Sequence, residues 1–335
     1  MNQNQRRPIP APKTLLFSTP AMYKLAEEIA SYRDPIFEHA PIELGEISWK
    51  NFPDTFPNIE IKNTKALRNA QVVFLMSIEN QSEVFGVLSA MHRLAQLASK
   101  GFMVVLPYFP TGTMERRDKE GTVATASSLA TLISAGMPPA GPGAIRLVTY
   151  DVHALPIMHF FGPNVSPYTK SATRILKDRL QDKKGISVVF PDEGAYKRFK
   201  AMFQDEETGA ELFPFVVCSK VRQGDMRVVT IKEGEVIGRH LVIIDDLIHT
   251  GGTLIECRNM LVANGAKSVG VWATHSVMEN NAWERFENAG FSFVWTTNSC
   301  PTTAAKLEGR APFVVFSLAG SIARVILGIE TTSAQ

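Results

Sequence analysis

Two adjacent carboxylates, Asp245 and Asp246, follow an apolar run at residues 241–244 and precede the segment Thr250-Gly-Gly-Thr253. A continuous run of β-forming residues is typical of a strand buried on both faces of a parallel sheet, and such sheets bind ligands at the carboxyl ends of their strands. The two acids could accept hydrogen bonds from vicinal sugar hydroxyls or hold a hydrated metal ion. The Thr and Gly residues would turn hydroxyls and backbone N–H groups toward an anion, and a helix starting just after them would add its positive end. The segment therefore predicts a sugar-phosphate site.

The simpler interpretation of this segment is an ordinary strand-to-helix turn with acidic caps, because Asp and Gly are common turn residues. Two adjacent acids before a Thr-Gly-Gly-Thr loop are more specific than that.

A second possible metal-binding pair lies in residues 147–154, just after a predicted strand. Asp151 and His153 stand two residues apart there, so they lie on one side of extended backbone. Asp192 again follows an apolar run and precedes a Gly-opened helix. A small number of protein ligands of this kind would be enough for Mg²⁺ that is bound mainly through phosphates. The alternative is a structural histidine that makes only hydrogen bonds.

Two cationic segments could contact phosphates. Residues 104–117 supply aromatic, small and basic side chains after a strand. They could form a surface for a nucleotide base and its phosphates, or they could be only a solvated loop. Lys220 and Arg222 stand two apart on a polar, Gly-containing stretch, where the usual interpretation is surface charge.

The elements that must position these residues alternate between apolar runs and helix-like periodic segments, which indicates an α/β protein with mainly parallel strands. We expect strands at 14–17, 72–76, 103–107, 146–150, 187–190, 214–218, 240–244, 268–274 and 291–296, and helices at 20–31, 84–99, 123–135, 166–180, 195–203 and 254–264. Residues 136–143 form a Pro/Gly-rich loop, and a boundary between two αβ series is expected near residues 161–167.

Composition limits the class of protein. A chain of 335 residues with 45% hydrophobic and 20% charged residues predicts a globular protein of two domains, and a net charge of +2 gives no reason to expect nucleic acid. Cys218, Cys257 and Cys300 have no C-x-x-C pair, so we expect small buried residues. Without an apolar leader or a run of about 18 apolar residues, no membrane is expected and a cytoplasmic location is the default. Walker, dinucleotide-fingerprint and zincin motifs and nucleophile elbows are absent from the sequence.

Residues 241–257 resemble the phosphoribosyl-pyrophosphate (PRPP) binding motif of type I phosphoribosyltransferases and PRPP synthetases. Five segments in order resemble the ribose-phosphate pyrophosphokinase (PRPP synthetase) family over nearly the whole chain: L-P-Y-F-P-T-G at 106–112, Y-D-V-H-A at 150–154, F-P-D-E-G-A at 190–195, S-K-V-R at 219–222 and D-D-L-I-H-T-G-G-T at 245–253. Three segments look most like the plant-type, class II branch: Phe109-Pro-Thr-Gly112, residues 190–199 and Trp283-Glu-Arg-Phe286. This branch implies phosphate independence and a loose choice of phosphoryl donor.

The resemblance implies two tandem domains of the type I phosphoribosyltransferase-like fold: 14–163, joined by 316–330 returning to it, and 164–315. It also implies that ribose 5-phosphate binds Asp245, Asp246, His249, Thr250, Gly251, Gly252 and Thr253. Mg²⁺ would bind His153 and Asp192, the catalytic residues would be Lys220 and Arg222, and the nucleotide would contact Phe52, Asp54, Thr113, Met114, Glu115 and Arg116. The implied reaction is in-line attack of the ribose 1-hydroxyl on the β-phosphorus of MgATP, releasing AMP, in a homo-oligomer.

Two departures from the bacterial and animal-type pattern bear on this assignment. Thr113-Met114 replaces Arg-Gln on the nucleotide side, which puts strict ATP preference in question, and His249 replaces an Asp in the ribose-phosphate loop. A protonated His249 could favour phosphate.

Two rival functions remain open. One is a non-catalytic, synthetase-associated regulatory subunit of the same fold, against which the retained Lys220, Arg222, His153 and Asp192 argue. The other is a phosphoribosyltransferase, which would not explain the donor-side motifs at 106–112 and 150–154.

Overall fold

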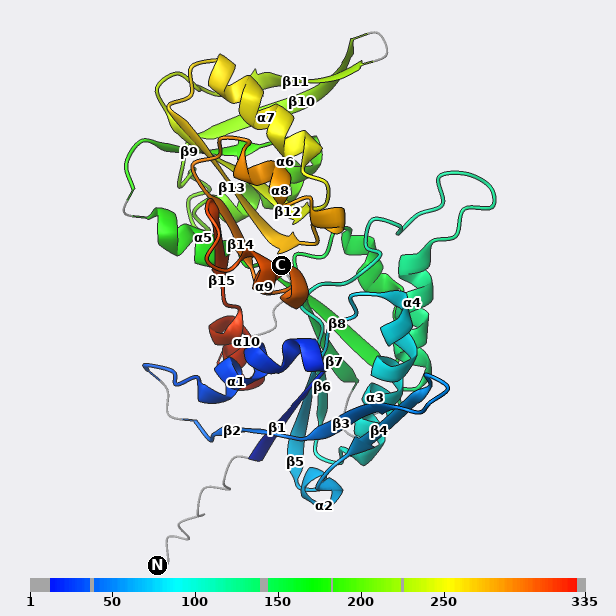
Figure 1. The fold of residues 1–335 in the computed structure, drawn as a ribbon. Coiled ribbons are helices and arrows are strands. Elements are labelled where there is room, and N and C mark those ends of the chain that lie inside the picture. The colour runs from blue at the N-terminus through cyan, green and yellow to red at the C-terminus, as the bar shows by residue number, and fades with distance from the viewer. Residues whose placement is uncertain (1–12, 37–38, 139–143, 182, 224–225, 330–335) are drawn as a thin grey trace, which may run out of the picture. The chain divides into compact units, whose positions relative to one another are not determined.

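The computed structural model describes residues 13–36, 39–138, 144–181, 183–223 and 226–329, with only the backbone described at 220–223 and 226–228. The chain divides into two compact units (Figure 1). The first comprises the residues up to Thr149, Ala154–Thr169 and the segment from Ala319 onward; the second comprises Tyr150–His153 and Lys170–Leu318.

The N-terminal unit is built on a six-stranded sheet of order β2-β1-β5-β6-β7-β8, in which the pairs from β2 to β7 are parallel. Its strands are β1 (Lys13–Ser18), β2 (Ile42–Leu44), β5 (Ala70–Leu75), β6 (Phe102–Val105), β7 (Ile145–Tyr150) and β8 (Val165–Lys170), with a separate antiparallel ribbon of β3 (Ile47–Asn51) and β4 (Pro57–Ile61). Its α-helices are α1 (Tyr23–Ser31), α2 (Thr64–Leu67), α3 (Val84–Leu97), α4 (Thr125–Ala135) and α10 (Ala319–Ile326).

The C-terminal unit is built on a seven-stranded sheet of order β11-β10-β9-β12-β13-β14-β15, parallel except for the β10–β11 hairpin. Its strands are β9 (Ile186–Phe190), β10 (Phe215–Gln223), β11 (Met226–Glu233), β12 (His240–Ile248), β13 (Ser268–Ser276), β14 (Val294–Thr297) and β15 (Phe313–Phe316). Its α-helices are α5 (Thr173–Leu180), α6 (Glu193–Phe199), α7 (Gly252–Ala263), α8 (Glu284–Glu287) and α9 (Pro301–Leu307). The predicted α/β class with two mainly parallel sheets is confirmed.

One predicted helix is wrong over its first turns. Residues 165–170 form the edge strand β8, and α5 starts only at Thr173. Val165, Tyr168 and Thr169 favour extended backbone, and Pro167 lacks an N–H, which an edge strand tolerates but a helix interior does not.

The last helix, α10, belongs to the N-terminal unit, where it packs against α1. Arg324 on α10 forms an ion pair with the buried carboxylate of Asp34, which also accepts a 2.9 Å hydrogen bond from the Tyr32 hydroxyl. The chain thus returns to its first unit after completing the second.

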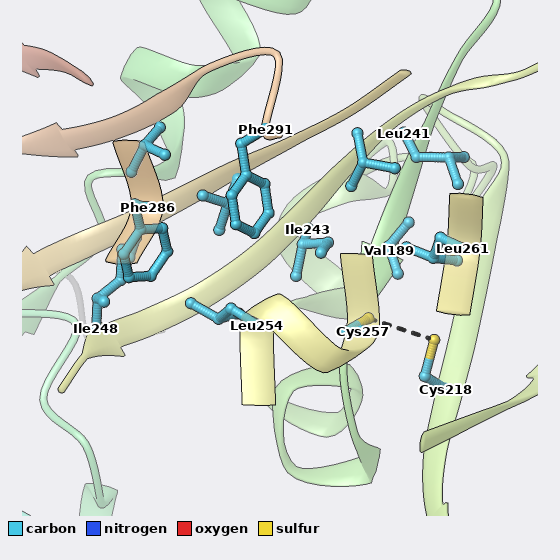
Figure 2. Packing of buried hydrophobic residues seen from close by; sticks show 14 of the residues in the cluster. Val189, Cys218, Leu241, Ile243, Ile248, Leu254, Cys257, Leu261, Phe286 and Phe291 are labelled. Carbon is cyan, nitrogen blue, oxygen red and sulfur yellow. Dashed lines mark hydrogen bonds between the residues drawn. The ribbon is translucent and has the colours of Figure 1, made fainter. Parts of the chain in front are cut away.

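The strand β12 and the helix α7 share one apolar core. Leu241 and Ile243 of β12 pack with Leu254, Cys257 and Leu261 of α7 (Figure 2). The thiols of Cys218 and Cys257 lie 3.9 Å apart, and all three cysteines are free and buried, as predicted. Because α7 is fixed on the sheet, the loop that joins it to β12 is fixed at both ends.

Among the described residues, no helix has both the length and the apolar composition needed to span a membrane.

Candidate active site

The central strand β12 runs further than the sequence predicted. It pairs with β13 from His240 opposite Ser268 to Ile248 opposite Ser276, so both aspartates lie within the strand rather than after it. The strand β9, which leads to Asp192, pairs with β12 on its other side. The carboxyl ends of parallel strands lie at the same edge of a sheet, so Asp192, Asp245 and Asp246 lie at one edge of this sheet.

Asp246 is buried and held by two cationic or hydrogen-bonding groups. Its Oδ2 atom lies 2.8 Å from His153 Nδ1 and 3.0 Å from the guanidinium of Arg198. Burial opposes its ionisation, but the hydrogen bond from His153 and the charge of Arg198 outweigh burial and hold the pKa of Asp246 well below its usual range. Asp246 is therefore a carboxylate at neutral pH.

Asp245 has the opposite character. Burial, followed by the negative charge of Asp246 and a smaller effect of Asp192, raises the pKa of Asp245 well above its usual range. Its Oδ1 atom accepts a 2.9 Å hydrogen bond from the backbone N–H of Asp246. The two adjacent acids thus share one site with unequal affinity for a proton.

Arg198 organises this cluster, and the sequence interpretation did not single it out. Besides the ion pair with Asp246, its guanidinium donates a 2.9 Å hydrogen bond to the carbonyl of His153 and a second bond to the carbonyl of Val152. The residue stands within the quoted 190–199 segment, on the helix that Asp192 begins. The only signal in the sequence was a basic residue on that helix. The carboxylate that it pairs with, Asp246, lies on β12, far along the chain.

Both predicted metal ligands take part in hydrogen bonds. Asp192 Oδ1 accepts a 3.0 Å hydrogen bond from the N–H of Ala195 and so caps α6, while His153 faces Asp246. In the described part of the chain, no group of three or more His, Cys, Asp or Glu residues could enclose a metal ion. One or two protein ligands are enough for Mg²⁺, which can take its other ligands from phosphates and water.

Asp151 does not serve as the partner of His153 that the sequence suggested. Its buried Oδ2 atom accepts hydrogen bonds from the N–H of Ala172, at 2.9 Å, and from the hydroxyl of Thr274, at 2.5 Å. These bonds give Asp151 a structural role.

The loop between β12 and α7 has the backbone of an anion cradle. Gly251 adopts a φ of +73° and is the N-cap residue of α7, whose first bond runs from the Ile255 N–H to the Gly251 carbonyl at 3.0 Å. The helix starts at Gly252, two residues before the predicted start. The first N–H groups of a helix lack intrahelical partners, so this end of α7 can receive a negative charge.

The loop also contacts residues that follow β13. His249 Nε2 lies 3.3 Å from Glu279 Oε1, and the Thr250 carbonyl accepts a 2.7 Å hydrogen bond from Arg285. The sequence interpretation missed Glu279 and Arg285. Arg285 stands inside the quoted W-E-R-F segment, which was the only available signal.

The predicted nucleotide residues lie on two loops of the N-terminal unit. Phe52 and Asp54 belong to the turn of the β3–β4 ribbon, where Asp54 Oδ1 accepts a 3.2 Å hydrogen bond from the Phe56 N–H. Thr113, Met114, Glu115 and Arg116 lie in the loop after β6, where Arg116 Nε is 3.2 Å from Asp118 Oδ1. Both side chains of the predicted catalytic pair, Lys220 and Arg222, fall outside the described residues; their backbone lies in β10, opposite Val229 and Arg227 of β11.

Two mainly parallel α/β sheets, with an acidic strand end and a Gly-opened helix in the second, place the chain in the class of α/β proteins whose ligands bind at the carboxyl ends of the strands. Two families match: the "N-terminal domain of ribose phosphate pyrophosphokinase" over residues 14–136 and the "Phosphoribosyl synthetase-associated domain" over residues 209–326.

Full-length relatives agree with these matches. The chain is 42% identical to the mitochondrial ribose-phosphate pyrophosphokinase 3 of Spinacia oleracea over 97% of this chain and 80% of that protein. It is 40% identical to ribose-phosphate pyrophosphokinase 4 of Oryza sativa subsp. japonica over 95% of this chain and 97% of that protein. The chain therefore belongs to the ribose-phosphate pyrophosphokinase family, and the predicted likeness to its plant members is confirmed.

A solved structure supports the fold. The phosphoribosylpyrophosphate synthetase from Mycobacterium smegmatis superposes with a TM-score of 0.75 at 23% identity, covering 95% of this chain and 98% of that chain.

Proposed function

We propose that this chain is an active ribose-phosphate pyrophosphokinase, which transfers the β,γ-diphosphoryl group of ATP to the 1-hydroxyl of ribose 5-phosphate and yields PRPP and AMP. The observation that carries the proposal is the strand–loop–helix unit of β12 and α7, where an acidic pair precedes a Gly-opened helix start. That unit occurs in a chain that matches plant members of the family over nearly its whole length.

The acceptor sugar binds the C-terminal unit. The Thr250–Thr253 loop and the first N–H groups of α7 receive the 5-phosphate, because a helix N-terminus stabilises an anion. Asp246, ionised by Arg198 and His153, accepts hydrogen bonds from a ring hydroxyl. Asp245, whose pKa is raised, can donate as well as accept a hydrogen bond there.

Mg²⁺ is the cofactor that the family generally uses, and His153 with Asp192 would hold it. When bound, the ion supplies positive charge to the phosphates of the donor. Phe52, Asp54 and residues 113–116 would contact the nucleotide, and His249, whose Nε2 lies 3.3 Å from Glu279 Oε1, would lie beside the 5-phosphate.

In the reaction, an oxygen lone pair of the ribose 1-hydroxyl forms a bond to the β-phosphorus. The bond between the β-phosphorus and the oxygen that links it to the α-phosphate breaks, AMP leaves with that electron pair, and the hydroxyl proton is released. Lys220 and Arg222 would neutralise the charge on the transferred group, since phosphoryl transfer depends mainly on positioning and charge stabilisation.

The experiment is to incubate the purified chain with ribose 5-phosphate and MgATP, without added phosphate, and to quantify AMP and PRPP. We expect the two products in equal amounts. The absence of both with every nucleoside triphosphate tested would contradict the proposal and favour the synthetase-associated regulatory subunit.

Lys220→Ala tests the catalytic assignment. We expect kcat to fall by about three powers of ten or more, because charge stabilisation in the transition state is lost, with an unchanged thermal unfolding transition. Full activity of this variant would show that Lys220 is not catalytic.

Two further expectations remain predictions. Homo-oligomerisation is a property that the resemblance implies. A cytoplasmic location is the default of the sequence, whereas the spinach relative is described as mitochondrial.

A further inference from the structure

One short segment, residues 277–286, contacts the last residue of β12, Ile248, and the next three residues, which begin the loop between β12 and α7. The N–H groups of Val277 and Met278 each donate a 3.1 Å hydrogen bond to the Ile248 carbonyl. The three residues that follow Ile248 also contact this segment. His249 lies beside Glu279, the Thr250 carbonyl accepts a hydrogen bond from Arg285, and Gly251 packs against the ring of Phe286.

We propose that Arg285 is a positioning residue for ribose 5-phosphate, which rests on the proposed function of this loop. Arg285 donates a 2.7 Å hydrogen bond to the Thr250 carbonyl. In a trans peptide, the C=O of one residue and the N–H of the next point in opposite directions. By holding the Thr250 carbonyl, Arg285 fixes the Gly251 N–H on the opposite side of that peptide, and this N–H is one of the donors that the loop offers to an anion.

Phe286 fixes the neighbouring residue. A Cβ atom on Gly251 would lie 2.3 Å from the Phe286 ring, so the ring packs directly against the Gly251 backbone. Phe286 is fully buried, and its ring stacks on Phe291 with centroids 5.5 Å apart. Figure 2 shows Phe286 near Ile248 and Leu254, the two core residues on either side of the loop. The backbone at Gly251 is thereby limited on one face by a rigid aromatic core.

The rest of α8 keeps Arg285 in place. Phe286, next in sequence, is anchored in the core, and the ring of Trp283, which precedes the helix, packs under the Arg310 guanidinium at 4.6 Å. Arg285 itself is exposed, so its hydrogen bond competes with water and contributes modestly. We therefore expect a defect in binding of ribose 5-phosphate rather than loss of the fold.

The test compares Arg285→Ala and Arg285→Lys with a matched control, Arg258→Ala. Arg258, on α7, is partly exposed and also donates to a backbone carbonyl, that of Gly290, at 2.8 and 3.2 Å, as well as to Asn259 Oδ1 at 3.1 Å. Its acceptor lies beyond α8 and outside the loop. The control therefore removes an arginine–carbonyl bond of the same kind without touching Thr250.

We expect Arg285→Ala to raise KM for ribose 5-phosphate by about five- to tenfold, with kcat and KM for ATP within about twofold of wild type. The lysine variant should recover part of the loss, because an ammonium group can still donate to the Thr250 carbonyl. Arg258→Ala should keep the wild-type KM for ribose 5-phosphate. Equal KM values in the two alanine variants, or an equal rise of both substrates' KM in Arg285→Ala, would overturn the inference.

Calorimetric titration with ribose 5-phosphate alone separates this inference from the proposed function. Wild-type chain that binds ribose 5-phosphate but makes no PRPP would contradict the proposed function only, and the dissociation constants of the same variants would then test Arg285. Wild-type chain that neither binds ribose 5-phosphate nor makes PRPP would overturn both.

Discussion

The adjacent residues Asp245 and Asp246 differ in charge because their surroundings differ. Asp246 faces His153 and the guanidinium of Arg198, whereas Asp245 is enclosed with two other carboxylates nearby. The sequence predicted both as site residues but could not predict this difference, since Arg198 and His153 are brought to Asp246 from distant parts of the chain.

Asp245→Asn should stabilise the fold while impairing activity. A carboxyl whose folded pKa is raised destabilises the fold as pH rises above the unfolded value of about 3.9, because ionisation then favours the unfolded chain. An amide lacks this cost, so we expect a gain of about 1–2 kcal/mol in the free energy of unfolding at pH 7. Urea unfolding at pH 7 and pH 3 measures it, and the gain should vanish at pH 3. A variant less stable than wild type at pH 7 would show that Asp245 is favourably ionised.

Arg198→Ala should destabilise the fold by about 3 kcal/mol at pH 7, because it leaves the buried Asp246 carboxylate without its cationic partner. The pKa of Asp246 is lowered, so this contribution is present above the unfolded value of about 3.9 and is lost as pH falls toward the folded value. Urea unfolding at pH 7 and pH 3 should therefore show a large defect at pH 7 and a smaller one at pH 3.

Arg239→Ala is the control for Arg198, since Arg239 makes a 3.2 Å ion pair with the exposed Glu235. It should change the free energy of unfolding by less than about 0.5 kcal/mol. Equal effects of the two variants would contradict the assigned role of Arg198.

At the scale of elements, burial decided which strands could be predicted. All interior strands of both sheets were found, because a strand with neighbours on both sides is a continuous apolar run. The four edge strands were missed: β2, β8, β11 and β15. Edge strands are half-solvated, and three of these four have mixed composition; β8 even carries Pro167, whereas the apolar β15 is only four residues long. The β3–β4 ribbon, which also lacks a full sheet around it, was missed for the same reason.

Gly251→Ala tests the strand–loop–helix unit. The substitution places a Cβ at a φ of +73° and 2.3 Å from the Phe286 ring, so we expect a loss of about 2–3 kcal/mol and weaker binding of ribose 5-phosphate. Gly265→Ala is the control, because that glycine has a φ of +88° but its nearest atom would lie at 3.5 Å. It should lose only about 1 kcal/mol. Thermal and urea unfolding compare the two, and equal losses would contradict the close packing of Phe286.

Across the whole molecule, the last helix, α10, belongs to the same unit as the first strands. Its contact with that unit joins residues 290 positions apart, which no local sequence pattern encodes. The resemblance to a known family implied this return, whereas periodicity did not. Within that unit, the ion pair of Arg324 with the buried Asp34 connects α10 to the segment after α1.

Arg324→Ala should lower the free energy of unfolding of the N-terminal unit by about 3 kcal/mol, because the buried Asp34 carboxylate would lose its cationic partner while keeping the hydrogen bonds from the Tyr32 hydroxyl and the Ile36 N–H. Limited proteolysis should cut the variant faster between β15 and α10. Lys62→Ala, which removes an exposed ion pair with Glu60 in the same unit, is the control and should have little effect. Unchanged proteolysis of Arg324→Ala would show that apolar packing alone holds α10.

The fate of each phosphate of ATP shows whether this chain transfers a diphosphoryl group to ribose 5-phosphate. With ATP labelled by radioactive phosphorus at the β position, we expect the label to leave the nucleotide and to appear in PRPP, in a one-to-one ratio to AMP. Label at the α position should remain entirely in AMP. Recovery of the β label in ADP or inorganic phosphate, or in unchanged ATP after prolonged incubation with ribose 5-phosphate and Mg²⁺, would contradict diphosphoryl transfer.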